Sequence, residues 1–149
     1  MTAIAIDTRI PVRVSRHYEC APERVFDAWL DARNVGRWLF VTPTGKMKSV
    51  QLDPRVGGSF TLTESRPEGE AEHHGQYLEI TRPRRLVFTF SSLRHAVDVD
   101  PVMVEITPAP EGGCDLVLVH EMQGRWADYR DRTRQGWAAI LEGLGRHLA

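Results

Sequence analysis

Two histidines and a glutamine stand at positions where a β-strand would turn them toward apolar neighbours. His120 has the same parity as Leu116 and Leu118, and His74 has the same parity as Gln76. Because side chains on one face of a strand recur at every second residue, these polar groups are expected to point inward. A histidine there could hydrogen-bond a ligand or transfer a proton near neutral pH. The alternative is a polar side chain that is satisfied by the backbone or by water.

The inward orientation of His74 and Gln76 depends on the rest of their strand. Leu78 and Ile80 share their parity, so all four face the apolar side unless a bulge intervenes. The neighbouring His73 would then face outward. No third ligand accompanies these histidines at a recognisable spacing, so we expect no metal and no other cofactor.

Large apolar side chains from separate segments are expected to enclose the same space. Phe88 and Phe90 alternate along one strand, Trp137 lies within a helical stripe, and Trp38 follows two short helices. Ordinary alternatives exist, a core anchor for Trp137 and helix packing for Trp38. Ligand pockets combine many such side chains with a few polar groups that orient the ligand. The expected ligand-binding set is His74, Gln76, Phe88, Phe90, Leu118, His120, Trp137 and Trp38.

Hydrophobic periodicity predicts the elements that would position these residues. Apolar residues step by three or four from Trp126 to Leu148, which predicts a long amphipathic helix. Pro22 suits the first turn of a short helix, and Asn34 can cap a second one. Alternation and turn residues predict strands at Thr8–Glu19, Ser49–Leu52, Ser59–Glu64, His73–Ile80, Arg85–Ser91, Val102–Thr107 and Asp115–Glu121.

This order of elements predicts an α+β fold in a single domain of residues 1–149. A sheet with one apolar face must cover that face, and the C-terminal helix is the only predicted element long enough to do so. We therefore expect a seven-stranded antiparallel sheet wrapped around the long C-terminal helix, with two short helices after the first strand. The space between sheet and helix is the expected ligand site.

Composition and charge exclude several classes of protein. The 149 residues carry 19 Lys and Arg against 20 Asp and Glu, which leaves no overall basic footprint for nucleic acid. No apolar run reaches the roughly 20 residues of a membrane helix, and Met1 to Asp7 lacks the features of a secretory signal. We expect a cytoplasmic protein without membrane insertion. Its two cysteines, Cys20 and Cys114, exclude a disulfide scaffold and favour two free thiols over one long-range disulfide.

Several short motifs, taken in order over nearly the whole chain, resemble one known family. They are Phe-Asp-Ala-Trp-Leu-Asp at 26–31, Arg-Trp at 37–38, Val-Gly-Gly-Ser-Phe at 56–60, His-Gly-Gln-Tyr-Leu-Glu-Ile at 74–80, Pro-Arg-Arg-Leu-Val-Phe-Thr-Phe at 83–90, Leu-Val-Leu-Val-His at 116–120 and Gln-Gly-Trp at 135–137. This set resembles the Hsp90 ATPase activator homologue-like family of the START-like, Bet v 1-like superfamily. The resemblance implies the helix-grip fold. It also implies a function among hydrophobic-ligand binders, transfer proteins and aromatase or cyclase enzymes.

Three hypotheses about function remain open. The first is a protein that binds an apolar or aromatic small molecule between sheet and helix. The second is a polyketide cyclase-like or aromatase-like enzyme with His120 or His74 as its acid or base. The third is an interaction module that touches a chaperone through its outer sheet face. A hydrophobic small molecule is the expected partner, and a homodimer stays open.

Overall fold

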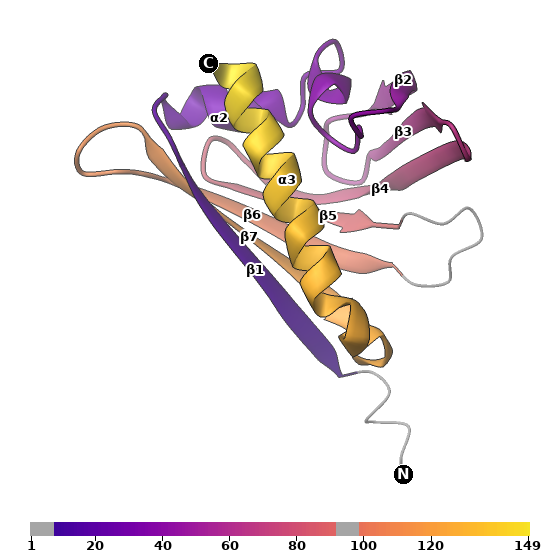
Figure 1. Ribbon diagram of the computed structural model, residues 1–149. Coiled ribbons are helices and arrows are strands. Elements are labelled where there is room, and N and C mark those ends of the chain that lie inside the picture. The colour runs from indigo at the N-terminus through magenta and orange to yellow at the C-terminus, as the bar shows by residue number, and fades with distance from the viewer. Residues whose placement is uncertain (1–7, 92–98) are drawn as a thin grey trace.

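The computed structural model describes residues 8–91 and 99–149. These residues form one antiparallel seven-stranded sheet in the order β1-β7-β6-β5-β4-β3-β2, and a long helix crosses one of its faces (Figure 1). The elements in chain order are β1 (Arg9–Tyr18), α2 (Pro22–Ala28), η1 (Val35–Arg37), β2 (Lys46–Leu52), β3 (Ser59–Arg66), β4 (Gly69–Thr81), β5 (Arg85–Phe90), β6 (Asp100–Pro108), β7 (Cys114–Gln123), η2 (Gly124–Tyr129) and α3 (Arg130–Leu148).

The sheet is an antiparallel meander from β2 to β7, and the first strand, β1, is added at the edge next to β7. Each of β2 to β6 pairs with the next strand in the chain, whereas β1 pairs over its whole length with β7. The short helix α2 and the 3-10 turn η1 therefore carry the chain from one edge of the sheet to the other. The predicted α+β helix-grip architecture is confirmed, including the two short helical elements after the first strand.

The buried side of α3 holds this helix against the sheet. Four apolar side chains at spacings of three or four are buried there: Trp137, Leu141, Leu144 and Leu148. The predicted helix began at Trp126, but α3 begins at Arg130, because Trp126 leaves helical geometry (φ −102°, ψ 22°) inside the 3-10 turn η2. Trp126 and Tyr129 consequently pack on each other near the surface, at 5.6 Å between ring centroids, instead of joining the buried stripe.

A bulge in β4 reverses the predicted orientation of its polar residues. The register with β5 shifts directly after Tyr77, so Leu78 is an extra residue whose side chain is 49% exposed. The buried Tyr77 therefore sets the parity of the preceding residues, and His73 rather than His74 faces the interior. The inward orientation expected for His74 and Gln76 is wrong for this reason, and Gln76 is exposed.

Both cysteines are free thiols, with Cys114 buried at the start of β7 and Cys20 half-buried just before α2. Within residues 8–91 and 99–149, no three His, Cys, Asp or Glu side chains converge where they could hold a metal ion. In the same part of the chain, every helix is too short or too polar to cross a bilayer.

Candidate functional site

An open groove of about 580 Å³ runs between α3 and the segment that follows η1. We call it the α3 groove. One wall is the exposed side of α3, and the other combines the chain from 37 to 43 with the paired strands β3 and β4. The lining residues are Arg37, Trp38, Phe40, Val41, Thr42, Pro43, Arg66, His73, Gly136, Ala139, Ile140, Gly143 and Arg146.

Phe40 is the centre of an aromatic cluster in this groove. Its ring stacks on His73, with centroids 4.4 Å apart and planes within 7°, and on Phe90 at 5.2 Å. It also meets Trp137 edge-on at 5.8 Å. The backbone of Phe40 has a φ of 58°, the left-handed region that costs a side-chain-bearing residue roughly 1–2 kcal/mol. Such strain persists where surrounding contacts enforce it and is frequent at binding sites.

Glu64 fastens the segment that forms the groove wall. Its carboxylate is fully buried and accepts hydrogen bonds from the Thr42 backbone N–H at 2.6 Å and the Thr42 hydroxyl at 2.8 Å. Arg66 Nε donates a further bond at 2.5 Å. Burial acts to raise the pKa of Glu64, but these hydrogen bonds outweigh it and hold the pKa below its usual range. A side chain at Gly45 would collide with this carboxylate, so glycine is required there.

His73 brings a neutral polar group to the groove. Burial lowers the pKa of His73 to about 4, and the nearby Arg66 acts in the same direction, so the ring is uncharged at neutral pH. Its Nδ1 is buried and has no hydrogen-bond partner among the described residues. A buried nitrogen without a partner costs free energy, which a ligand that hydrogen-bonds to it would recover.

His120, in contrast, is committed to contacts within the protein. The Trp137 indole N–H donates to His120 Nδ1 at 2.9 Å, which fixes the tautomer with the proton on Nε2. His120 Nε2 donates to Asp100 Oδ2 at 2.9 Å, and Arg9 pairs with the other oxygen of Asp100 at 2.8 Å. Both ring nitrogens are thus engaged, so His120 joins β7, β6 and α3 and holds no free lone pair toward the groove.

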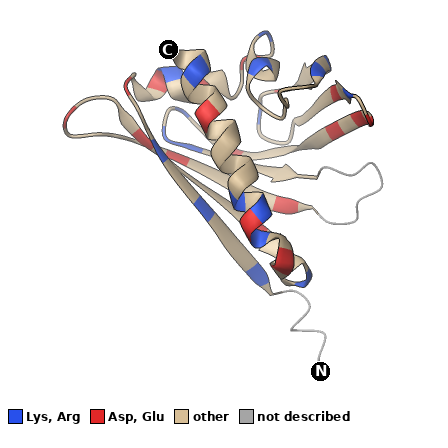
Figure 2. Cartoon of the chain, viewed as in Figure 1, with Lys and Arg blue, Asp and Glu red and all other residues tan. Residues whose placement is uncertain are grey.

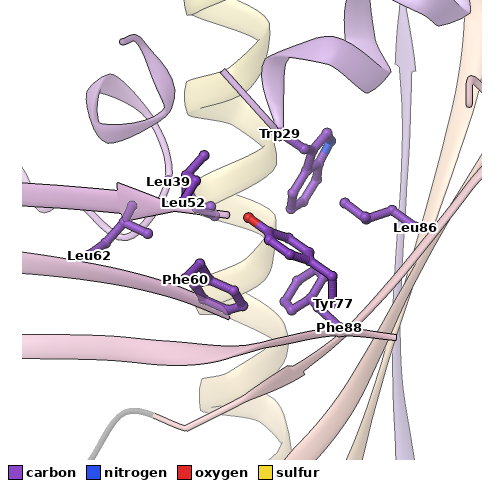
Figure 3. Close-up of a pocket in the computed structure, with 8 residues that line it drawn as sticks. All are labelled: Trp29, Leu39, Leu52, Phe60, Leu62, Tyr77, Leu86 and Phe88. Atoms are coloured by element: carbon purple, nitrogen blue, oxygen red, sulfur yellow. The ribbon is translucent and has the colours of Figure 1, made fainter. Parts of the chain in front are cut away.

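A second, apolar space lies deeper, between α2 and the sheet, and we call it the inner cavity. Its walls are Trp29, Leu39, Leu52, Phe60, Leu62, Tyr77, Leu86 and Phe88 (Figure 3). The hydroxyl of Tyr77 points into it, and burial raises the pKa of that phenol. The free volume is about 10 Å³, about what one water molecule needs. The side chains therefore fill the inner cavity, and the α3 groove is the larger opening.

The structure distributes the expected site residues over several places. Trp38 lines the α3 groove, and Phe90 and Trp137 lie directly behind its Phe40. Phe88 lines the inner cavity, and Leu118 is fully buried in the core.

On the outer face of β4, the His74 ring lies 3.3 Å from the Glu72 carboxylate, and Gln76 is exposed. His73 is the functional candidate that sequence reasoning missed. Tyr77 and Leu78 gave a usable signal for His73, because two adjacent large apolar residues break strand alternation.

A family model describes most of this chain. The model for "Activator of Hsp90 ATPase homolog 1-like protein" matches residues 19–149. The chain belongs to this family. The match begins directly after β1 and includes α2, every later strand and α3, so it contains the whole α3 groove.

Solved structures share the fold of this family member. A protein from Chromobacterium violaceum has a TM-score of 0.80 at 23% identity, covering 93% of this chain and 96% of its own. A protein of unknown function from Staphylococcus aureus has a TM-score of 0.82 at 16% identity, covering 94% and 93%. DynU16, a protein in the dynemicin biosynthetic locus, has a TM-score of 0.75 at 20% identity, covering 93% of this chain and 46% of its own. No curated protein matches the sequence.

Proposed function

We propose that this protein binds a small apolar or aromatic molecule in the α3 groove. The observation that carries the proposal is the α3 groove itself, whose wall contains the buried Phe40 stacked on His73 and a buried His73 nitrogen that lacks a partner among the described residues. A site of this kind holds a ligand through buried apolar area and orients it through a single polar contact. Burial contributes about 25 cal/mol per Å² of apolar surface removed from water.

The size of the groove and its family support this proposal. A volume of about 580 Å³ falls in the range of roughly 300–1,000 Å³ that is usual for small-molecule sites. START-like folds commonly bind hydrophobic ligands, and the family to which this chain belongs has that fold. The anchoring of Thr42 by Glu64 supplies a wall that is formed before the ligand arrives.

The test is the binding of an uncharged aromatic dye, N-phenyl-1-naphthylamine, measured by its fluorescence. We expect saturable binding of one dye per chain, and its loss in the variant Ala139→Phe, which fills the groove from the exposed side of α3. The variant Gln135→Phe adds the same ring at an exposed α3 position outside the groove lining and should bind normally. Equal binding by both variants, or no binding by the wild type, would contradict the proposal. Native mass spectrometry of freshly purified protein would identify a retained natural ligand.

A further inference from the structure

The charged residues in the described lining of the α3 groove are all arginines. Its described lining includes three arginines, Arg37, Arg66 and Arg146, and no Asp or Glu. Figure 2 shows basic residues on the last turns of α3, next to one acidic segment of this helix, and further basic residues on the chain between α2 and β2. An apolar groove edged by cations favours a ligand that has an anionic end.

Arg66 is already neutralised and does not contribute to this preference. Its Nε lies 2.5 Å from the carboxylate of Glu64, which is completely buried and cannot leave. Glu64 therefore neutralises the charge of Arg66. The other two arginines of the lining, Arg37 and Arg146, remain as cations that could bind an anion.

Arg37 and Arg146 keep their charge available to a ligand. Arg37 forms no ion pair with any described residue and is exposed. Among the residues that the structure describes, Arg146 pairs only with the exposed Glu142, at 3.3 Å, and Glu142 also lies 3.8 Å from Arg16. One carboxylate shared between two arginines leaves this end of the groove with excess positive charge.

These two arginines both lie near the backbone of Trp38. Arg37 directly precedes Trp38 in the chain. On α3, a methyl group at Gly143 would stand 3.6 Å from Arg146 Nη2 and 3.7 Å from the Trp38 carbonyl oxygen, so Arg146 and Trp38 meet at that glycine. From this end the wall continues through Trp38 to Phe40, whose ring stacks on His73.

We propose that the ligand of the α3 groove is an amphipathic organic anion, whose acidic group is bound by Arg37 and Arg146 and whose apolar body lies against Trp38 and Phe40. The inference rests on the proposed function and narrows it from apolar molecules to apolar acids. Arginine suits this role because its planar guanidinium donates hydrogen bonds to a carboxylate, sulfonate or phosphate oxygen in a fixed geometry.

A matched pair of dyes tests the charge preference directly. The dye 8-anilino-1-naphthalenesulfonate has the aromatic body of N-phenyl-1-naphthylamine with one sulfonate added. We expect it to bind about fivefold tighter at low salt, the size that two exposed ion pairs support. Because exposed charges are screened, the advantage should largely disappear in about 0.5 M NaCl. Both affinities should fall in Ala139→Phe, which assigns the binding to the groove.

Arginine variants then locate the anion site. The double variant Arg37→Gln with Arg146→Gln should reduce the affinity for the sulfonate dye to that for the uncharged dye. The control Arg33→Gln, an exposed arginine outside the groove lining, should leave both affinities unchanged. Equal affinity of the wild type for the two dyes, or a double variant that still prefers the sulfonate, would overturn this inference while the proposed function stands. Failure of both dyes to bind would overturn both.

Discussion

Protonation of His73 should destabilise the fold as the pH falls below neutrality. Burial, together with the nearby Arg66, lowers the pKa of His73 to about 4 in the folded protein, whereas an exposed histidine in the unfolded chain titrates near 6.5. Between these values the unfolded chain binds more protons than the folded chain, so the free energy of unfolding decreases as the pH falls. The variant His73→Phe removes the titration and keeps a flat ring against Phe40 and Phe90.

The size of the effect follows from the two pKa values. Linkage predicts almost no contribution at pH 7.5, a loss of about 2 kcal/mol at pH 5 and a loss of about 3 kcal/mol at pH 4. Carboxylates such as Glu64 also titrate at low pH. They are present in both proteins, so their contribution cancels when the wild type is compared with His73→Phe, apart from the electrostatic interaction between Glu64 and His73.

Urea unfolding followed by tryptophan fluorescence at pH 7.5, 6, 5 and 4.5 measures this difference. We expect the wild type to lose stability relative to His73→Phe with each step below pH 6.5, and the variant to be no less stable at pH 7.5. Parallel pH profiles would show that His73 is accessible to water and would refute the argument for a buried neutral imidazole in the groove.

Four further predictions concern Trp137, two glycines, His17 and the effect of a chelator. Trp137→Phe leaves His120 Nδ1 without its donor and should lower the free energy of unfolding by about 1–3 kcal/mol in urea titration; an unchanged midpoint would contradict the bond. Gly136→Ala adds a methyl group that meets no described atom within 4 Å and should stabilise α3 by up to about 1 kcal/mol, whereas Gly75→Ala collides with a main-chain carbonyl and should lower the melting temperature. His17, whose pKa is raised by hydrogen bonds to two carboxylates, should stabilise the fold below about pH 6.5 and lose this effect as the pH rises through its folded pKa. The variant His17→Gln should therefore have a lower free energy of unfolding than the wild type in acid only. EDTA should leave the melting temperature unchanged, and a decrease on chelation would reveal a structural metal.

The fold was predictable because each element has its own periodic signal. The spacing of Trp137, Leu141 and Leu144 indicates one buried helix face, and alternation in β5 to β7 indicates one apolar sheet face. Boundaries were less predictable. β4 begins at Gly69 instead of His73, because β3 and β4 stay paired up to the tight turn that joins them. The residues near this turn are polar and have no hydrophobic periodicity.

The candidate site was harder to predict because it depends on two local irregularities. One extra residue at Leu78 turns His73 inward and moves His74 to the outer face. The left-handed backbone of Phe40 directs its ring onto His73, and no propensity predicts φ of 58° for a phenylalanine. The adjacent apolar pair Tyr77 and Leu78 is a trace of the bulge in the sequence, whereas the backbone conformation of Phe40 leaves no such trace.

The first strand of the chain, β1, pairs with the last strand, β7, so these two partners are synthesised far apart in time. Arg9 lies opposite Gln123, and Tyr18 lies opposite Cys114, so β1 finds its partner only after the chain has been made as far as β7. The hairpins from β2 to β6 join neighbours in the chain and close at a small entropic cost, whereas closing so long a loop is slow. We therefore expect β1 to pair after the meander has formed, and pulse-labelled hydrogen exchange during refolding should find its amides among the last to gain protection.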